Sequence, residues 1–218
     1  MIADIKEEQK LWKIGFKAVV GLDEAGRGPL AGPVVAAAVC LHKFSMSNKA
    51  KIVGLKLKDS KKLTPAARKS FYKIIKKSRE LKWGIGIVSE KVIDKINILE
   101  ATKLVMLKAL SCLQRKIPKK KKIDFLILDG NFRINSKISQ KSIVKGDEKV
   151  FSCAAASIIA KVTRDRIMVA YHKKYPKYRF DLHKGYPTKY HRKMLQKYGP
   201  CPIHRISFSD IRSIEIDI

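Results

Sequence analysis

The sequence from Val19 to Val35 is VVGLDEAGRGPLAGPVV. An apolar run ends in two adjacent carboxylates, Asp23 and Glu24, and a turn rich in glycine and proline follows. A second apolar run begins directly after the turn. Two such runs predict neighbouring β-strands over residues 17–23 and 34–41. The two acids therefore lie at the end of a strand that we expect to be buried.

Strands and helices alternate along the rest of the chain. Strands are expected at residues 83–88 and 123–128, with a weaker one at 143–144, and helices at about 65–78, 98–113, 152–174 and 188–197. Thr64 and Pro65 form a typical helix start, with threonine as the cap and proline at the first helical position. The small-residue run at 153–157 should let its helix approach a sheet closely. This order predicts an α/β domain with a mixed sheet flanked by helices.

The charge balance points to a polyanionic partner. The 218 residues include 48 Lys and Arg against 19 Asp and Glu, a formal net charge of +29. Nucleic acid, an anionic membrane surface and an acidic protein are the candidates, and a general lysine bias is the alternative. No apolar stretch approaches the ~20 residues of a spanning helix. The four cysteines form no CxxC pair, and no signal-peptide core is present, so we expect a cytoplasmic protein with reduced thiols.

Acids are scarce in this chain, yet they recur where predicted strands end next to glycine. Asp23 and Glu24 end the first strand, Asp129 follows the strand at 123–128, and Asp147 follows the weak one. Functional groups gather at such ends in α/β sheets, and converging carboxylates repel one another unless a cation lies between them. Their oxygens suit Mg²⁺ or Mn²⁺, and two such ions can hydrolyse a phosphodiester. The alternative is that these acids cap helices or pair with lysine and arginine.

One geometric requirement follows for the first two acids. Adjacent residues of a regular strand point to opposite faces, so Asp23 and Glu24 cannot both face one site from it. We therefore expect the strand to break there, where the turn of Gly26, Arg27, Gly28 and Pro29 begins.

Several long motifs, in order, resemble the ribonuclease HII family in its bacterial form. They are DEAGRGP at 23–29, DSKKL at 59–63, INILEAT at 96–102, LDG at 128–130, KGD at 145–147, AAASIIAKVTRDR at 154–166, HKGYPTKYH at 183–191 and YGPCPIHRISF at 198–208. The resemblance covers nearly the whole chain from about Val19. It implies a ribonuclease H-like fold, with Asp23, Glu24, Asp129 and Asp147 as the catalytic, metal-binding carboxylates of a Mg²⁺ or Mn²⁺ site.

The resemblance also implies the reaction. The expected activity is endonucleolytic cleavage on the 5′ side of a ribonucleotide, in RNA/DNA hybrids and in duplex DNA with an embedded ribonucleotide. It leaves 3′-hydroxyl and 5′-phosphate ends and removes ribonucleotides from DNA. Gly26, Arg27 and Gly28 match the loop that reads the 2′-hydroxyl at the RNA–DNA junction, and Tyr186 matches the tyrosine at the same junction. A monomer is expected.

Other residues are assigned from their surroundings. Lys61 and Lys62 precede a helix N-terminus, a place suited to substrate phosphate, although a solvated pair is the alternative. Asp165 lies inside a helix between two arginines and is expected to make structural ion pairs. Pro187 stands where many family members have glycine, and Glu148 beside Asp147 makes the fourth ligand ambiguous.

Three parts of the chain are expected: an N-terminal extension over 1–16, a ribonuclease H-like catalytic domain over 17–174, and a helical segment over 175–218 that completes the substrate cleft. Two rivals to the endoribonuclease stay open. A different metal-dependent nuclease or strand transferase would share the acids but gives no reason for the GRG turn. A basic nucleic-acid-binding protein without catalysis would need neither Mg²⁺ nor Asp23.

Overall fold

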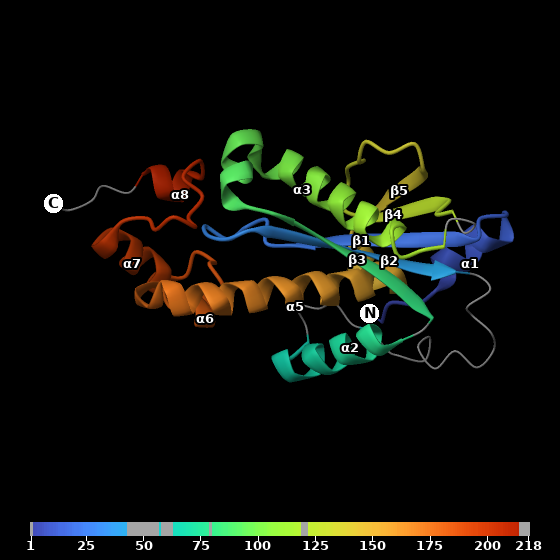
Figure 1. The fold of residues 1–218 in the computed structure, drawn as a ribbon, viewed down its shortest axis with the longest axis horizontal. Helices are drawn as coiled ribbons and strands as arrows, with labels where there is room; N and C mark the ends of the chain where they lie inside the picture. The colour runs from blue at the N-terminus through green and yellow to red at the C-terminus, as the bar shows by residue number, and fades with distance from the viewer. Residues whose placement is uncertain (1, 43–56, 58–62, 79, 119–121, 214–218) are drawn as a thin grey trace.

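The fold is a single mixed sheet with helices on both faces, seen in a computed structural model that describes residues 2–42, 57, 63–78, 80–118 and 122–213 (Figure 1). The five strands lie in the order β3-β2-β1-β4-β5. The first three are antiparallel neighbours, whereas β1, β4 and β5 run parallel. β1 therefore joins the two halves of the sheet, and the predicted mixed α/β architecture is confirmed.

The strands are β1 (Ala18–Ala25), β2 (Val34–His42), β3 (Leu81–Val88), β4 (Phe125–Asp129) and β5 (Ser139–Ile143). Four lie where the apolar runs predict them. The prediction of a strand at 143–144 is wrong in extent, because β5 comprises the polar sequence SQKSI and ends at Ile143. This strand lies at the edge of the sheet and pairs only with β4 among the described strands, so it needs no apolar run.

The longer helices are α1 (Lys6–Lys13), α2 (Pro65–Lys77), α3 (Glu90–Gln114), α5 (Phe151–Lys174) and α7 (Lys189–Tyr198). The Thr64 hydroxyl caps α2 by accepting from Ala67 N, as the sequence predicts. α3 begins eight residues before the expected Ile98, and Asn97 interrupts it with φ 62°. Its side chain then accepts from Leu99 N and Glu100 N, so it caps the second part of α3.

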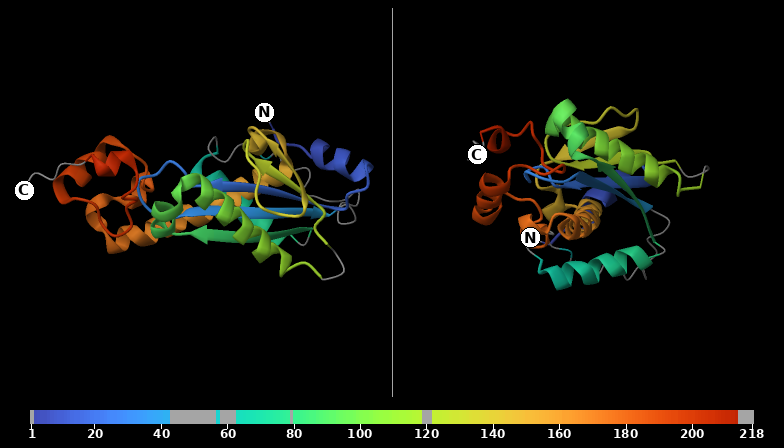
Figure 2. Two further views of the ribbon diagram at one scale, coloured as in Figure 1. Left: turned by 90° about the horizontal axis from the view of Figure 1, so that it is seen from above. Right: turned by 60° about the vertical axis from the view of Figure 1, so that its left-hand side comes forward.

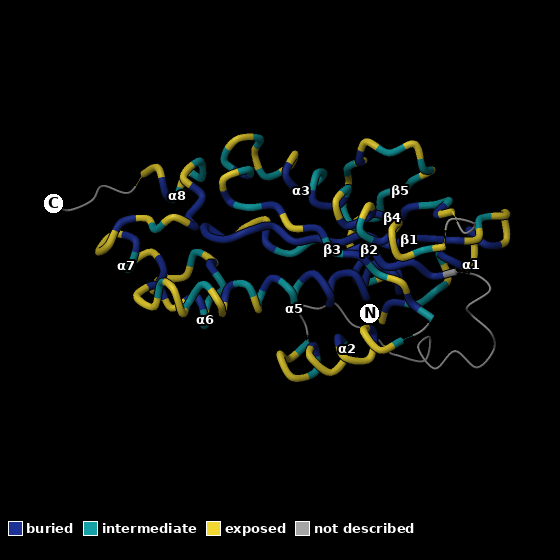
Figure 3. Tube along the Cα trace, in the orientation of Figure 1, coloured by how far each residue is buried: buried dark blue, intermediate teal, exposed yellow. Residues whose placement is uncertain are grey.

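Alternating side chains of the sheet build two cores. Val19, Ala37 and Val39 face α5, whereas Val20 and Leu22 face α3. Figure 2 shows the sheet end-on between these two helices, and Figure 3 shows that most of β1 and β2 and the start of α5 are buried. The start of α5, with its small residues, lies close to the sheet, as predicted. A Cβ on Gly21 of β1 would lie only 2.5 Å from Cys153 N. No helix in the described ranges is both long and apolar enough to cross a bilayer.

The C-terminal segment has a smaller core of its own at one end of the sheet (Figure 1). Its short helices are η2 (Pro176–Tyr178), α6 (Phe180–His183) and α8 (Ser209–Arg212), beside α7. Leu30 and Ala31, from the loop that follows β1, contribute to this core. The loop after β1 is thus held between the sheet and the C-terminal segment.

Candidate active site

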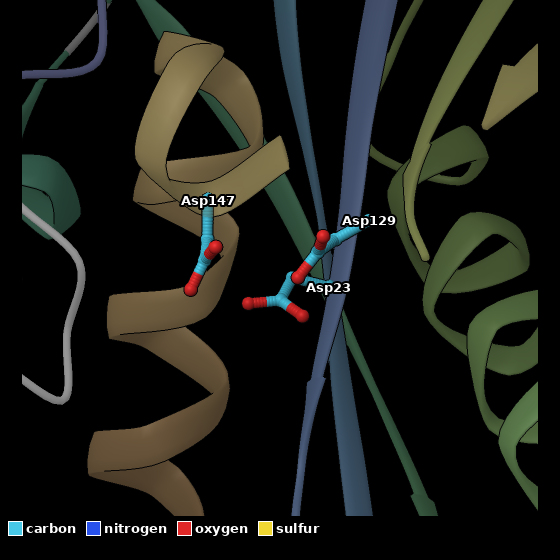
Figure 4. A group of neighbouring side chains, drawn as sticks. All are labelled: Asp23, Asp129 and Asp147. Carbon is cyan, nitrogen blue, oxygen red and sulfur yellow. The ribbon is translucent and has the colours of Figure 1, made fainter. Parts of the chain in front are cut away.

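Three carboxylates converge at the carboxyl ends of β1 and β4. Asp23 comes from β1, Asp129 is the last residue of β4, and Asp147 comes from the short helix α4 (Gly146–Lys149). Each offers an oxygen within 4.8 Å of the others. Figure 4 shows Asp147 reaching from the helical side toward the two strand residues. Asp23 and Asp147 are buried, so the group lies inside the protein rather than on its open surface.

The repulsion between these close carboxylates favours the binding of a cation. Burial raises the pKa of Asp23 well above its usual range, and the charges of Glu24, Asp129 and Asp147 raise it further. A hydrogen bond from the Ser157 side chain acts in the opposite direction. Carboxylate oxygens are the ligands that Mg²⁺ and Mn²⁺ prefer, and a divalent ion would remove the repulsion between these groups. The donor set therefore fits the predicted metals.

The backbone around α4 orients two of the three acids. Lys145 adopts φ 56°, a left-handed conformation that turns the chain directly after β5. Gly146 N then donates a 2.7 Å hydrogen bond to Asp129 Oδ1. Because Asp147 follows at once, the same turn presents its carboxylate beside Asp129.

The structure places Glu24 differently from the expectation that it would face the same site as Asp23. The strand does not break at the two acids: β1 continues to Ala25, with Asp23 paired to Ala37 and Glu24 to Ala36. The two side chains therefore leave the strand on opposite faces. Glu24 lies outside the group of three, but it is at the strand end and its side chain lines the adjoining cavity.

That cavity, of about 430 Å³, brings together most of the predicted site residues. Its lining contains Glu24, Ala25, Gly26, Arg27, Gly28, Asp129, Gly130, Ser157, Lys161 and Tyr186. Sequence reasoning did not select Ser157 and Lys161. They lie four residues apart on α5, so they share one helix face, and this spacing within the motif at 154–166 was the available signal.

The glycines of the loop after β1 have different roles. Gly26 has φ +103°, and a Cβ there would lie 2.1 Å from Arg164 Nε. Gly28 is exposed, and a Cβ there would meet no atom within 4 Å. Gly26 is thus required by the fold, whereas Gly28 leaves the backbone open toward the cavity. Arg27 Nη1 lies 3.6 Å from Glu24 Oε1, an ion pair of the kind considered as the alternative role of the acids.

Two arginines hold this loop in place, and sequence reasoning assigned them no role. Arg164 and Arg205 are fully buried. Arg164 donates to the carbonyls of Ala31, Pro33 and Lys184, and Arg205 donates to those of Gly26, Arg27 and Gly32. Burial lowers the pKa of Arg164 to about 10 and that of Arg205 to about 9. Planar guanidiniums with several donors suit a loop that exposes carbonyls to the interior.

Tyr186 lines the cavity from the C-terminal segment with its side chain partly exposed. Its ring lies 5.6 Å from Lys161 Nζ. Its carbonyl oxygen lies 2.9 Å from His191 Nδ1, and His191 Nε2 lies 3.0 Å from His204 Nε2. His204 Nδ1 lies 2.8 Å from Cys201 N, which donates to it, and 3.1 Å from Cys201 O. Because the Tyr186 carbonyl can only accept, His191 Nδ1 carries a proton, and the contact between the two Nε2 atoms requires one of them to be unprotonated. The two rings thus form a hydrogen-bonded chain that ends at Tyr186.

The remaining predictions have separate outcomes. Lys61 and Lys62 lie outside the described residues. Asp165 makes the predicted structural ion pairs, with Lys161 at 2.8 Å and Arg68 at 3.7 Å. It reaches Lys161 from one turn further along α5, so it also orients a residue that lines the cavity.

Comparison with known proteins agrees with this geometry. The family model described as Ribonuclease HII matches residues 20–211. The chain is 50% identical over 202 residues to a ribonuclease HII of Caldicellulosiruptor bescii, covering 92% of this chain and 91% of that one. It is 48% identical over 202 residues to a ribonuclease HII of Syntrophus aciditrophicus, covering 92% and 88%. The crystal structure of the ribonuclease H2 from Pyrococcus horikoshii OT3 is similar, with a TM-score of 0.70, 29% identity and coverage of 91% and 97%.

Proposed function

The chain belongs to the ribonuclease HII family, and from that premise we propose how its own residues carry out the reaction. The protein is an endoribonuclease that cleaves RNA in RNA/DNA hybrids and at ribonucleotides embedded in DNA, with a site for Mg²⁺ or Mn²⁺. We assign Asp23, Glu24, Asp129 and Asp147 as the catalytic carboxylates that hold the metal. The observation that carries this proposal is the approach of three of them to within 4.8 Å.

Divalent ions held there would activate water and neutralise the charge that develops on the leaving oxygen. The chain itself contributes the orientation of the ligands. Gly146 N holds Asp129 by its Oδ1 atom, and the Ser157 side chain hydrogen-bonds to Asp23. Ligands held in this way lose little freedom when the metal binds.

Recognition of the ribonucleotide is proposed for the loop of Gly26, Arg27 and Gly28 together with Tyr186. The exposed backbone at Gly28 can approach a 2′-hydroxyl closely, and this hydroxyl is the group that distinguishes RNA from DNA. The Tyr186 ring is placed to stack against the sugar or base on the neighbouring side. Lys161, which lines the cavity with Asp129 and lies near the Tyr186 ring, is suited to bind the phosphate next to the scissile bond.

The finer features of the reaction belong to the same proposal. Cleavage takes place on the 5′ side of the ribonucleotide, leaves 3′-hydroxyl and 5′-phosphate ends, and serves ribonucleotide removal from DNA. Lys61 and Lys62 bind substrate phosphate. The protein acts as a monomer in the cytoplasm.

We propose residues 17–174 as the catalytic domain, 175–218 as the segment that completes the cleft, and 1–16 as an extension. The position of Tyr186 in the cavity wall supports a role for the C-terminal segment in the site. The extension packs Leu11 and Trp12 into the same core as α5.

The decisive experiment uses duplex DNA that contains one ribonucleotide, incubated with the protein with and without Mg²⁺, followed by mapping of the product ends. The proposal expects metal-dependent cutting at one position, with a 3′-hydroxyl left on the DNA side. An all-DNA duplex of the same sequence should bind and stay intact. Equal cutting of both duplexes would show a nuclease without ribose recognition, and binding without cutting would show a protein without this activity.

A further inference from the structure

The N-terminal extension holds the chain at the junction of α4 and α5. It lies before the residues that the family model matches, which begin at residue 20. Asp4 N donates to Lys149 O at 3.2 Å, and Phe151 N donates to Asp4 O at 2.9 Å. The two strands of chain thus form a short parallel bridge between Asp4 and Val150. This contact lies three residues after Asp147.

The extension also caps the long helix that follows. The cap position of α5 is Val150, whose side chain cannot accept a hydrogen bond. The N–H groups of the first helical turn have no partner within the helix. Here Phe151 N is satisfied by Asp4, and Ser152 N donates a 2.9 Å hydrogen bond to Glu8 Oε1. Glu8, 144 positions earlier in the sequence than Ser152, therefore provides the N-capping acceptor of α5.

Glu8 is unusual for a glutamate, because its side chain is fully buried. It has no ion-pair partner within the described part of the chain. Burial raises its pKa, which means that the buried position costs stability wherever the carboxyl is charged. The positive end of the α5 dipole, the Ser152 N–H and the Ser152 side chain offset this cost. A leucine or methionine would fill the same space without this desolvation cost. The contribution that only Glu8 makes here is therefore its acceptor oxygen.

The helix that Glu8 caps carries several parts of the site. Its start follows α4, which presents Asp147, and Val150 N donates to Gly146 O at 2.8 Å. Further along, the same helix places Ser157 beside Asp23 and Lys161 in the cavity wall. A displacement of the start of α5 would therefore move groups on both sides of the acidic cluster.

We propose that Glu8 is a positioning residue for the metal site: by capping α5 from the N-terminal extension, it sets where α5 begins and so where Asp147 stands relative to Asp23 and Asp129. The proposal rests on the assignment of these three carboxylates as metal ligands. It adds a residue that precedes those matched by the family model to the residues that shape the site.

The test measures metal binding by the full-length protein without nucleic acid, so that it does not depend on activity. Mn²⁺ is added to the metal-free protein, and the free ion is followed by electron paramagnetic resonance. Residues that orient metal ligands typically alter affinity by about 10–100-fold, and we expect Glu8→Ala to weaken Mn²⁺ binding by about tenfold. Glu8→Gln retains an oxygen acceptor for Ser152 N and should bind Mn²⁺ close to the parent level.

Leu11→Ala is the matched control. Leu11 lies on the same helix and in the same core as Phe151, but it makes no contribution to the cap. It should lower the melting temperature while leaving Mn²⁺ affinity unchanged. An equal loss of affinity in Leu11→Ala and Glu8→Ala would mean that general loosening, not the cap, is responsible, and would overturn the proposal.

Parent-level affinity in a folded Glu8→Ala protein would also overturn it. If that variant does not fold, Glu8→Asp, which draws the carboxylate back by one methylene, is measured instead, and parent-level affinity there has the same meaning. Asp129→Asn tests the metal-site assignment separately from the role of Glu8. If it binds Mn²⁺ as the parent does, the assignment of the metal site is wrong; if it binds weakly while Glu8→Ala binds normally, only the role of Glu8 is wrong.

Discussion

The Nη2 atom of Arg205 donates a 2.6 Å hydrogen bond to the carbonyl oxygen of Gly26, although 179 residues separate the two. The same guanidinium donates to the carbonyls of Arg27 and Gly32. One buried side chain from the C-terminal segment thus holds both ends of the loop that follows Asp23 and Glu24. The shape of the proposed recognition loop depends on a residue far outside it.

We therefore expect Arg205→Lys to damage both stability and activity. A lysine keeps the charge but cannot bond three carbonyls with a planar fork. The free energy of unfolding should fall by about 2–4 kcal/mol, because buried carbonyls lose charged donors. Urea unfolding measures this loss, and cutting of a single-ribonucleotide duplex should fall at least about tenfold as the loop moves. Arg192→Lys, at an exposed pair with Asp210, is the control and should change stability by less than about 1 kcal/mol.

Asp129→Asn should abolish cleavage while the fold and most of the affinity for nucleic acid persist. The substitution removes a ligand charge without changing side-chain size, and the lost charge stabilisation is worth about a thousandfold in rate. Cleavage assays in Mg²⁺ and duplex-binding titrations measure the two effects separately. Near-normal Mg²⁺-dependent cleavage would remove Asp129 from the catalytic set.

The two glycines of the loop should respond differently to substitution. Gly28→Val has open space around its new side chain, so the melting temperature should stay within a degree or two while cutting at a single ribonucleotide falls. Gly26→Ala should lower both, because its Cβ would overlap Arg164 and its φ is +103°. Thermal melts and cleavage of the same duplex give the comparison. Parent-rate cutting by Gly28→Val would exclude close backbone approach to the 2′-hydroxyl at this point.

The histidine chain beneath Tyr186 predicts a loss of stability in acid. Burial lowers the pKa of His191 to about 3 and that of His204 to about 4, whereas an unfolded histidine titrates near 6.5. The stabilising effect of the neutral rings is therefore complete above about pH 6.5 and declines as the pH falls toward the folded-state values. At pH 5 each ring should cost about 2 kcal/mol. Urea unfolding from pH 7.5 to 5 should show this decline, and it should be shallower in His191→Gln; parallel curves would contradict the lowered pKa of His191.

Binding to duplex should weaken steeply with salt. Lysines and arginines that neutralise phosphates release condensed counterions, so about four contacts give roughly a hundredfold loss between about 50 and 200 mM salt. The slope should be far smaller than the net charge of +29 would give, because only one face meets the duplex. Fluorescence anisotropy with a labelled all-DNA duplex measures it. A binding constant that barely changes would argue against phosphate contacts as the source of affinity.

Local pattern was sufficient for much of this fold and for the acidic cluster. Apolar runs predict β1 to β4, and the recurrence of scarce acids at or shortly after strand ends predicts the cluster of Asp23, Asp129 and Asp147. The sequence indicated β5 only by its last residue, Ile143, because the other residues of this strand at the edge of the sheet are polar.

Long-range contacts account for the rest. The partners of Arg164 and Arg205 are backbone carbonyls, most of them more than 130 residues away. Every residue has such a carbonyl, so residue type does not indicate which ones are bound. The role of α1 was hidden for the same reason, since Glu8 acts on the backbone of Ser152. The break expected at Glu24 was wrong because pairing with β2 keeps the strand regular to Ala25.

The bond between Arg205 and Gly26 joins the start of the chain to its end, and this has a consequence for the order of events during synthesis. The chain leaves the ribosome from its N-terminus, so the sheet and the acids up to Asp147 are available long before residue 205 emerges. Until then the carbonyls of the loop lack their buried donor and the cavity lacks one wall. We therefore expect a nascent or prematurely terminated chain that already contains all its carboxylates to lack the loop shape on which the proposed ribose recognition depends.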